Sequence, residues 1–254
     1  MKKNITFGFI LVLLVAFGVF FYSANNKKNI SPVLGDSENS LNSQNSLVLI
    51  DNYEVLWYKV QNIDRLILKS NLDNKDTATT LFSANNCEFL INGGFYSPEF
   101  KHLGLLVSDG MTVSEKQNNS LLNGFISVNS MATPKIGVLA DEEIRLALQT
   151  GPLLMENGQL KTLNIKNDKY ARRSIAMVTG ANELVFAIIY SGDARFSGPL
   201  LSETPGLIEI FSQKTTLHIA DAINLDGGKA SAFITSEIAV TELSPVGSLF
   251  CVVK

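Results

Sequence analysis

Short apolar runs separated by turn-forming residues recur through this chain between residues 47 and 253. The runs are rich in aliphatic and aromatic residues and are shorter than typical helices, and Gly, Asn and Asp stand between them. This punctuation is typical of β-strands joined by tight turns. The expected strands are 47–50, 53–60, 66–69, 87–91, 103–107, 111–114, 124–129, 146–149, 153–155, 174–178, 184–190, 222–225, 232–240 and 249–253.

Two segments carry helix signals instead. Asp76 stands where it can cap a short helix over residues 77–84, and Ser202 can cap a second helix with Pro205 in its first turn. In that second segment Leu207, Ile208 and Phe211 lie on one face. Together with the strands, these signals predict an α+β domain of mixed, largely antiparallel strands with a few helices.

The N-terminal segment has the composition of a membrane anchor or signal peptide. Two lysines precede an almost unbroken apolar run over residues 5–22, a length that fits a transmembrane helix. A cleaved signal peptide is the alternative, with Tyr22-Ser23-Ala24 as a loose cleavage site. In both cases the main domain is expected outside the cytoplasm, periplasmic or extracellular. We expect an anchor or signal peptide at 1–26, a flexible Asn- and Ser-rich linker at 27–46 and one domain at 47–254.

Composition excludes several classes of function. The 254 residues carry a net charge of -3 and no basic run in the body of the chain, so nucleic acid is not an expected partner. Two cysteines and two histidines do not have zinc-site spacing, and we expect neither a metal nor a cofactor. In an exported domain Cys87 and Cys251 either form a disulfide or stay as two buried free thiols, and both alternatives are open.

Two strands end in the same type of turn. Residues 87–91 lead into Asn92-Gly93-Gly94, and residues 222–225 lead into Asp226-Gly227-Gly228. Glycine permits a positive φ and a close approach of ligand to backbone, and successive N–H groups in such turns can bind anions. Taken alone, an Asp-Gly-Gly sequence is also compatible with an ordinary hairpin turn. The two turns are candidates for facing sides of one cleft.

Four stretches, in this order, resemble the phosphodiester glycosidase family. They are Asn92-Gly93-Gly94-Phe95-Tyr96, Gly151-Pro152-Leu153-Leu154, Arg172-Arg173-Ser174 and Asn224-Leu225-Asp226-Gly227-Gly228. The resemblance covers the chain from about residue 47 to the C-terminus and implies that these stretches line one pocket. It implies a substrate-binding set comprising Asn92, Gly93, Gly94, Gly151, Ser174, Asn224, Gly227, Gly228 and Ser231.

The residue types suit a sugar 1-phosphodiester. Arg173 offers a forked donor for phosphate oxygens, and Asp226 is the candidate nucleophile, general base or stabiliser of an oxocarbenium-like transition state. Phosphate leaves readily, so the demand for a second acidic group is reduced, although Glu99 and Asp193 are possible partners. The chain departs from the family pattern after Gly228, where Lys229 and Ala230 replace small hydroxyl residues. Lys229 either adds charge to a phosphate site or points into solvent.

These observations predict an exported hydrolase that cleaves the glycosidic bond of a sugar 1-phosphodiester in cell-surface or exopolysaccharide metabolism. Its expected partners are a sugar-phosphate or polysaccharide substrate and, through the N-terminal helix, the membrane. The alternative is a non-catalytic binding module for an anionic, phosphate-containing polysaccharide. Turnover distinguishes the two, because a binding module releases no reducing sugar.

Overall fold

The computed structural model describes residues 45–139 and 143–254, and the expected anchor or signal peptide at 1–26 lies outside them. Within the described part of the chain no helix has the length and apolar character needed to cross a membrane. Two α-helices are described, α2 (Ala78–Ala84) and α3 (Thr204–Thr215), with short 3-10 turns at Ile63–Arg65, Leu201–Glu203 and Gly228–Ala230.

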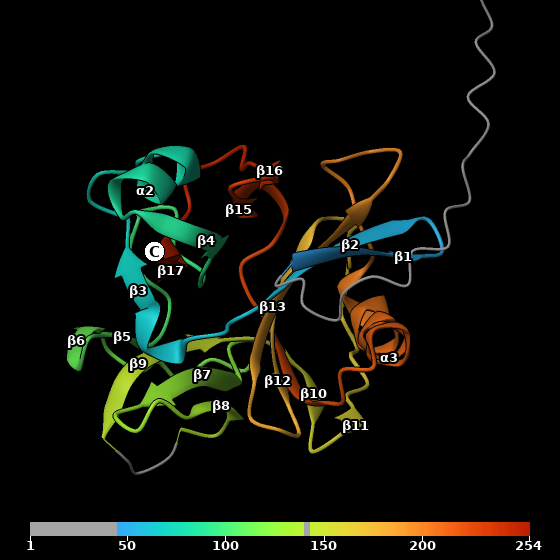
Figure 1. The fold of residues 1–254 in the computed structure, drawn as a ribbon, viewed down its shortest axis with the longest axis horizontal. Coiled ribbons are helices and arrows are strands. Elements are labelled where there is room, and N and C mark those ends of the chain that lie inside the picture. Colours follow the sequence, from blue (N-terminus) through green and yellow to red (C-terminus); the bar gives the residue numbers. More distant parts are fainter. Residues whose placement is uncertain (1–44, 140–142) are drawn as a thin grey trace, which may run out of the picture. The chain divides into compact units, whose positions relative to one another are not determined.

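Strands make up most of the fold, and they form three sheets in which every recorded pairing is antiparallel (Figure 1). The first sheet contains β1 (Asn45–Ile50), β2 (Tyr53–Lys59), β13 (Leu184–Ser191), β12 (Arg173–Thr179), β14 (Ile219–Asn224), β10 (Leu153–Glu156) and β11 (Gln159–Leu160), in that spatial order. The second contains β16 (Ala239–Val240), β15 (Phe233–Thr235), β4 (Cys87–Asn92), β17 (Ser248–Val253) and β3 (Leu66–Ser70). The third contains β6 (Met111–Ser114), β5 (Leu106–Ser108), β9 (Ile144–Thr150), β7 (Gly124–Asn129) and β8 (Pro134–Gly137). The expected α+β class with largely antiparallel strands is confirmed.

One core joins the three sheets. Alternate residues of the central strands face it, as Phe186 and Ile188 do on β13, and strands from all three sheets contribute to the same apolar cluster. Aromatic rings connect the sheets at its centre: Tyr58 of β2 stacks on Phe89 of β4 with ring centroids 4.1 Å apart, and Phe89 lies 5.7 Å from Phe186. This core fixes the ends of strands from different sheets relative to one another.

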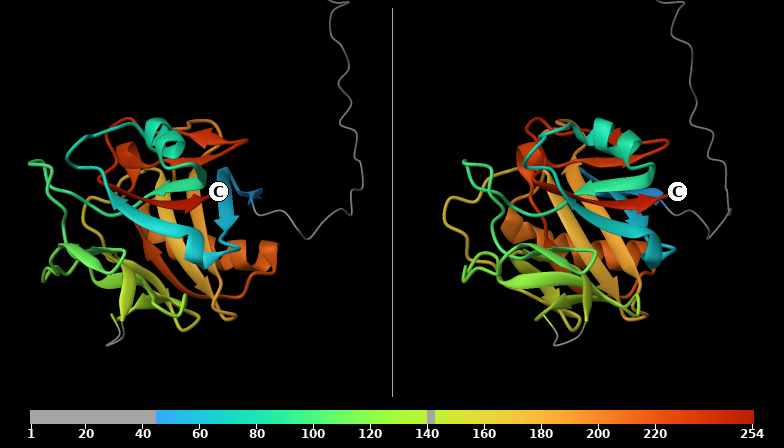
Figure 2. Two further views of the ribbon diagram at one scale, coloured as in Figure 1. Left: turned by 60° about the vertical axis from the view of Figure 1, so that its left-hand side comes forward. Right: turned by 90° about the vertical axis from the view of Figure 1, so that its left-hand side faces the viewer.

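The outer faces of two sheets are covered by the helices, as Figure 2 shows. Leu207, Ile208 and Phe211 of α3 pack on the face of the first sheet opposite the central core, so the expected apolar side of this helix is confirmed. Ala78 of α2 packs over β4 and β17 in a further buried cluster. Burial on both faces explains the unbroken apolar runs at 89–91 in β4, 175–178 in β12 and 184–190 in β13.

The two cysteines lie on neighbouring strands of the second sheet. Cys87 begins β4 and Cys251 lies in β17, and their sulfurs form a disulfide that joins positions 164 residues apart. Of the two alternatives left open by the sequence, the structure therefore selects the disulfide. It links the strand that leads to Asn92 with the C-terminal strand.

Three local expectations are wrong in detail. Thr77, not Asp76, caps α2, since its side chain accepts a hydrogen bond from the Thr80 N–H. Ser202 does not cap α3, because it lies in a 3-10 turn that precedes the helix. The expected strand 232–240 is divided into β15 and β16, because the Thr235 hydroxyl accepts hydrogen bonds from two following N–H groups and closes a turn there.

Candidate active site

The two Gly-Gly turns meet end to end although their strands belong to different sheets. The Asp226 N–H donates a hydrogen bond to the Gly93 carbonyl at 2.9 Å. In the opposite direction, the Asn92 side-chain amide donates to the Asp226 carbonyl at 2.5 Å. Asn92 ends β4 and Asn224 ends β14, so the common core brings both strand ends to one place.

Asn92 is the centre of the network that supports Asp226. Its side-chain oxygen accepts hydrogen bonds from the Ser174 hydroxyl at 2.7 Å and from the Ala232 N–H at 3.0 Å. The Ser174 carbonyl in turn accepts a hydrogen bond from the Leu225 N–H at 2.8 Å. Asn92 and Ser174 are buried, so their polar atoms hold the turns in place from behind.

The glycine N–H groups of these turns are mostly used inside the protein. Ser248 accepts from Gly93 through its carbonyl and from Gly94 through its hydroxyl, and the Arg172 carbonyl accepts from Gly228. The Gly227 N–H is directed to the Asp226 carboxylate. A Cβ at Gly227 would lie 2.9 Å from the Arg172 carbonyl oxygen, which accounts for glycine at this position. The turns therefore shape the site rather than offer a row of free anion-binding donors.

A cavity of about 630 Å³, here called the larger cavity, opens beside Asp226. This volume is within the range of small-molecule binding sites. Motif residues from four separate stretches reach it: Phe95, Gly151, Arg173 and Asp226. The full lining is Phe95, Tyr96, Leu103, Asn119, Ser120, Leu121, Leu122, Asn123, Gly151, Pro152, Thr162, Leu163, Asn164, Ile165, Ala171, Arg173, Leu201, Asn224, Asp226, Gly227 and Gly228.

The structure divides the expected site residues into two groups. Arg173, Gly151, Asn224, Asp226, Gly227 and Gly228 line the larger cavity. Asn92, Gly93, Gly94, Ser174 and Ser231 do not line it, and all five are buried. Glu99 and Asp193 are exposed and also lie outside the lining, so the structure does not bring them to Asp226.

Asp226 has the most strongly perturbed carboxyl of the site. It is partly accessible from the cavity, but protein atoms surround most of it. This burial raises the pKa of the Asp226 carboxyl to about 7, against the smaller opposing effect of the Gly227 N–H. A carboxyl with such a pKa exchanges its proton near neutral pH, as acid–base and nucleophilic groups in active sites often do.

Arg173 is the first residue of β12, and its guanidinium both bonds to neighbouring backbone and lines the cavity. Nε donates to the Pro199 carbonyl at 3.0 Å, and Nη2 donates to the Lys169 carbonyl at 2.5 Å. Nη2 also lies 3.5 Å from an oxygen of Asp168. Nη1 makes no recorded hydrogen bond to the described residues and lies close to Gly227. Thus one nitrogen of the fork stays available toward the cavity.

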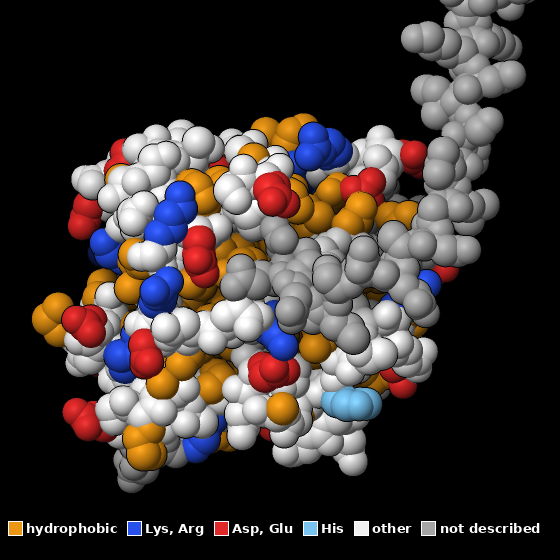
Figure 3. Space-filling view, viewed as in Figure 1, with side chains coloured by type: hydrophobic (Ala, Val, Ile, Leu, Met, Phe, Trp, Pro, Cys, Tyr) orange, Lys and Arg blue, Asp and Glu red, His pale blue; other side chains and the backbone are white. Residues whose placement is uncertain are grey.

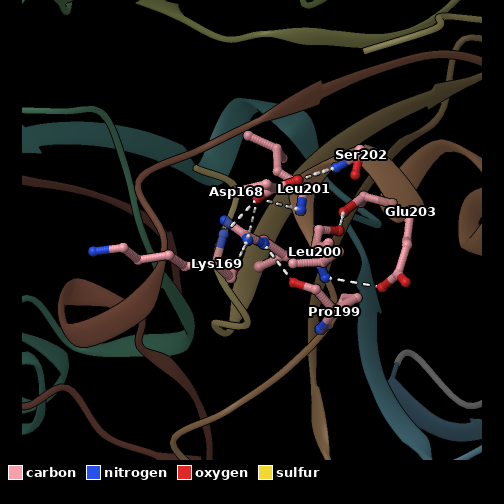
Figure 4. A network of polar contacts seen from close by, with 9 residues as sticks. Asp168, Lys169, Pro199, Leu200, Leu201, Ser202 and Glu203 are labelled. Atoms are coloured by element: carbon pink, nitrogen blue, oxygen red, sulfur yellow. Dashed lines mark hydrogen bonds and ion pairs between the residues drawn. The ribbon is translucent and has the colours of Figure 1, made fainter. Parts of the chain in front are cut away.

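Asp168 ties the loop before β12 to the turn before α3 (Figure 4). Its carboxylate accepts hydrogen bonds from the Leu201 N–H at 3.1 Å and the Ser202 N–H at 2.8 Å, in addition to the contact with Arg173. These donors lower the pKa of Asp168 although burial opposes them. Asp168 therefore stays ionised and holds one wall of the cavity against Arg173.

Asn224 holds another part of the cavity lining, the Gly151-Pro152 segment. Its side-chain amide donates to the Gly151 carbonyl at 3.0 Å, and its N–H donates to the Pro152 carbonyl at 3.1 Å. The Gly151–Pro152 peptide bond is cis. A Cβ at Gly151 would overlap the Leu121 carbonyl oxygen, so only glycine allows the loop around residue 121 to approach this closely. The Gly151-Pro152 motif thus helps to position the loop around residue 121, which contains none of the four motifs.

Sequence reasoning missed two loops of the cavity wall, 119–123 and 162–165. They contribute the amide groups of Asn119, Asn123 and Asn164 and apolar groups such as Leu163. Neither loop has strand or helix periodicity, and its position depends on which sheet edges meet. The available signal was that each belongs to a longer irregular segment, 115–123 or 161–172, that contains Asn residues. Irregular segments on a rigid scaffold often carry binding residues.

The two histidines, the other candidates for catalysis or metal binding, lie away from this cavity. His102 contacts the Ser70 hydroxyl, His218 is exposed, and neither lines the cavity, so no Ser/His/Asp triad is formed there. Over residues 45–139 and 143–254 there is no group of three or more His, Cys, Asp or Glu side chains that could hold a metal ion. On the face in Figure 3 basic and acidic side chains are interspersed and no continuous basic patch is seen.

Comparison with known proteins identifies a matching protein family and similar solved structures. A family model described as phosphodiester glycosidase matches residues 85–252. The fold is similar to the catalytic domain of zebrafish N-acetylglucosamine-1-phosphodiester alpha-N-acetylglucosaminidase, auto-inhibited by its pro-peptide, with a TM-score of 0.64, 14% identity, and 83% of this chain and 81% of that chain covered. A hypothetical protein from Synechocystis matches with a TM-score of 0.60, 14% identity, and 82% and 61% covered. A search among curated protein sequences finds no match.

Proposed function

Because the chain belongs to the phosphodiester glycosidase family, we propose that it hydrolyses the glycosidic bond of a sugar 1-phosphodiester, with Asp226 as the central catalytic group. The observation that carries this proposal is a carboxyl of raised pKa at a ligand-sized cavity that Arg173 also lines. The expected family resemblance from the four sequence motifs is confirmed, and at 14% identity the solved relatives support the fold rather than a particular substrate.

The reaction needs one carboxylate near the anomeric carbon. The C1–O bond breaks with its electron pair on the phosphate oxygen, a water oxygen bonds to C1, and the proton released from water passes to a base or to solvent. Among the described residues that line the cavity, Asp226 is the one carboxylic acid. Ionised Asp226 can act as nucleophile, as general base, or as the stabiliser of the oxocarbenium-like transition state. A phosphate leaving group takes the electron pair without strong protonation, so one carboxylate is sufficient.

The phosphate needs a cationic or N–H partner. In this proposal Arg173 gives its Nη1 to a non-bridging phosphate oxygen, while Nε and Nη2 keep the guanidinium fixed. A guanidinium held in this way loses little conformational freedom on binding, which favours affinity. The amides of Asn119, Asn123 and Asn164 are suited to hydrogen-bond sugar hydroxyl groups.

The remaining expected site residues receive different roles. Gly151, Asn224, Gly227 and Gly228 form cavity wall and approach the substrate directly. Asn92 and Ser174 hold the Asp226 turn through side-chain hydrogen bonds. Gly93, Gly94 and Ser231 hold the turns through their backbone, by hydrogen bonds with Asp226, Ser248 and Gly228. We propose that both groups are necessary for activity. An active site depends on the residues that contact the substrate and on the residues that hold those in position.

We also propose that the domain works outside the cytoplasm, attached to the membrane or secreted. The disulfide between Cys87 and Cys251 supports this, since disulfides persist in oxidising compartments. The apolar segment at 1–26 supplies either an anchor or a signal peptide. Protease added to intact cells should digest the domain, and complete protection in cells with an accessible surface would contradict this location.

The catalytic proposal is tested with full-length protein, its disulfide intact, and a panel of sugar 1-(methyl phosphodiesters). We expect release of reducing sugar in wild type and a loss of at least about 1,000-fold in Asp226→Asn, comparable to loss of a central catalytic group. Asp193→Asn, which changes an exposed carboxylate outside the cavity, is the matched control. In ¹⁸O-labelled water the label should enter the sugar. Label in the phosphate, or full activity in Asp226→Asn, would overturn the proposal.

Binding without turnover would instead support the non-catalytic module for anionic polysaccharide. In that case sugar phosphodiesters should bind saturably and no reducing sugar should appear with any member of the panel. Titration of each member of the panel into the full-length protein measures this binding directly.

A further inference from the structure

A second concavity of about 320 Å³, here called the smaller hollow, adjoins the larger cavity. Asp226 and Gly227 line both, together with Phe95 and Tyr96. These four shared residues show that the two spaces lie next to each other on the same turn. Asp226 therefore lies at a junction, with one space on each side for the two parts of a substrate.

The two spaces differ in their polar groups. The larger cavity offers several asparagine amides and apolar side chains, and its single cation, Arg173, has two of its three nitrogens bonded to the fold. The smaller hollow contains Lys229 and the hydroxyl-bearing residues Ser97 and Ser244. Amide-rich surfaces match sugar hydroxyls, whereas an ammonium with hydroxyl donors matches a phosphate.

The structure fixes the backbone of Lys229 and leaves its side chain free. The Lys229 carbonyl accepts hydrogen bonds from the Leu243 N–H at 2.7 Å and the Ser244 N–H at 3.1 Å. The side chain is exposed, and it makes no hydrogen bond or ion pair with the residues that the structure describes. The backbone of Lys229 is thus held in the lining that it shares with Asp226, and no acidic side chain among the described residues pairs with its ammonium.

We propose that the smaller hollow is the phosphate subsite and that Lys229 binds the phosphate leaving group, while the sugar occupies the larger cavity. This inference rests on the proposed function and names the orientation of its substrate. The phosphate lies over Gly227, between Arg173 Nη1 on one side and the Lys229 ammonium on the other. The rest of the aglycone then leaves through the smaller hollow.

This arrangement gives Lys229 a part in the rate as well as in binding. The bound phosphodiester carries one negative charge, and the departing phosphate monoester gains further negative charge as the C1–O bond breaks. A cation placed at the leaving oxygen therefore stabilises the transition state more than the ground state. A lysine that only points into solvent would affect neither the affinity for phosphate nor the rate of bond cleavage.

The first test measures phosphate binding without turnover. Glycerol 3-phosphate is titrated into full-length wild type, Lys229→Met, Lys229→Arg and Lys214→Met, and binding is followed by calorimetry. Lys214, on the exposed side of α3 outside both spaces, is the matched control. We expect Lys229→Met to weaken binding about tenfold, as removal of a charged hydrogen bond does, and the other two variants to stay within about twofold of wild type. Equal affinity in Lys229→Met and Lys214→Met would overturn the proposal.

The second test separates this inference from the proposed function. For a sugar 1-(methyl phosphodiester) we expect Lys229→Met to lower kcat/KM about tenfold or more, with no change for the neutral 4-nitrophenyl glycoside of the same sugar. Lys229-dependent phosphate binding without sugar release would retain the subsite and reject the catalytic function. Sugar release and phosphate binding that are both independent of Lys229 would retain the function and reject the subsite.

Discussion

The side-chain amide of Asn92 donates a hydrogen bond to the backbone carbonyl of Asp226, at 2.5 Å and across 134 positions of sequence. With the hydrogen bond from the Asp226 N–H to Gly93, it joins the two Gly-Gly turns into one unit. The position of the Asp226 carboxylate therefore depends on β4 as much as on β14. This contact identifies the residue whose loss should separate the two turns.

Asn92→Ala should reduce both stability and activity. The substitution leaves the Asp226 carbonyl, the Ser174 hydroxyl and the Ala232 N–H without their partner in a buried place. We expect a loss of about 1–3 kcal/mol in the free energy of unfolding per unsatisfied group, partly relieved by relaxation. Urea denaturation measures it, with Ser174→Ala as a milder companion at about 1 kcal/mol. A change below about 0.5 kcal/mol in Asn92→Ala would show that the network is unimportant.

The activity should rise with pH through the pKa of Asp226. If the carboxylate is the working form, kcat/KM increases as Asp226 ionises near pH 7 and then reaches a plateau. The measurement is a pH profile of sugar release with a substrate that does not titrate in this range. A profile that falls between pH 6 and pH 8 would indicate that the protonated acid is the working form.

Asp226→Asn should stabilise the protein at neutral and alkaline pH. Burial raises the folded-state pKa from 3.8 to about 7, so the folded protein holds this proton more tightly than the unfolded chain. The contribution to stability is fully present below the unfolded pKa and is lost as pH rises through the folded pKa. Asparagine removes this loss.

We therefore expect the gain in unfolding free energy from Asp226→Asn to be larger at pH 8 than at pH 5, by about 1–2 kcal/mol. One pKa unit corresponds to about 1.4 kcal/mol, and access of water from the cavity reduces the effect. Denaturation curves at both pH values give the comparison. A gain that is equal at the two pH values would contradict the raised pKa.

Asp168→Ala should weaken substrate binding more than it weakens the fold. It removes the acceptor for the Leu201 and Ser202 N–H groups and the ionic partner of Arg173. We expect KM for the phosphodiester to rise about tenfold as the wall and the Arg173 guanidinium lose their fixed positions. Steady-state kinetics and thermal denaturation are compared with Asp193→Ala. An unchanged KM would limit Asp168 to a role in stability.

Loss of the disulfide should destabilise the domain strongly. Cys87 and Cys251 close a loop of 164 residues, and removing a native disulfide typically costs about 2–5 kcal/mol. The double variant Cys87→Ala/Cys251→Ala avoids an unpaired thiol, and its urea midpoint should match that of reduced wild type. Equal midpoints for oxidised wild type and the variant would contradict the prediction.

Turn chemistry explains which local elements were predictable. Asp109-Gly110 joins β5 and β6, which correspond to the strands expected at 103–107 and 111–114, and both residues have positive φ, 49° and 76°, as a tight hairpin turn of this kind requires. The expected single strand over residues 232–240 failed because one side chain, Thr235, competes with the ladder for backbone N–H groups. The pattern of apolar residues alone does not reveal that a side chain will compete with strand pairing for backbone N–H groups.

The sequence by itself determined where strands deliver polar residues into glycine turns, since apolar periodicity and glycine act over a few neighbouring positions. Only the tertiary structure decided what those residues touch. The Gly93 and Gly94 N–H groups bond to Ser248, Arg173 keeps one nitrogen toward the cavity, and the cavity wall comes partly from loops without motifs. These outcomes depend on how three sheets pack around one core, and such contacts join positions too distant in sequence for a local pattern to specify.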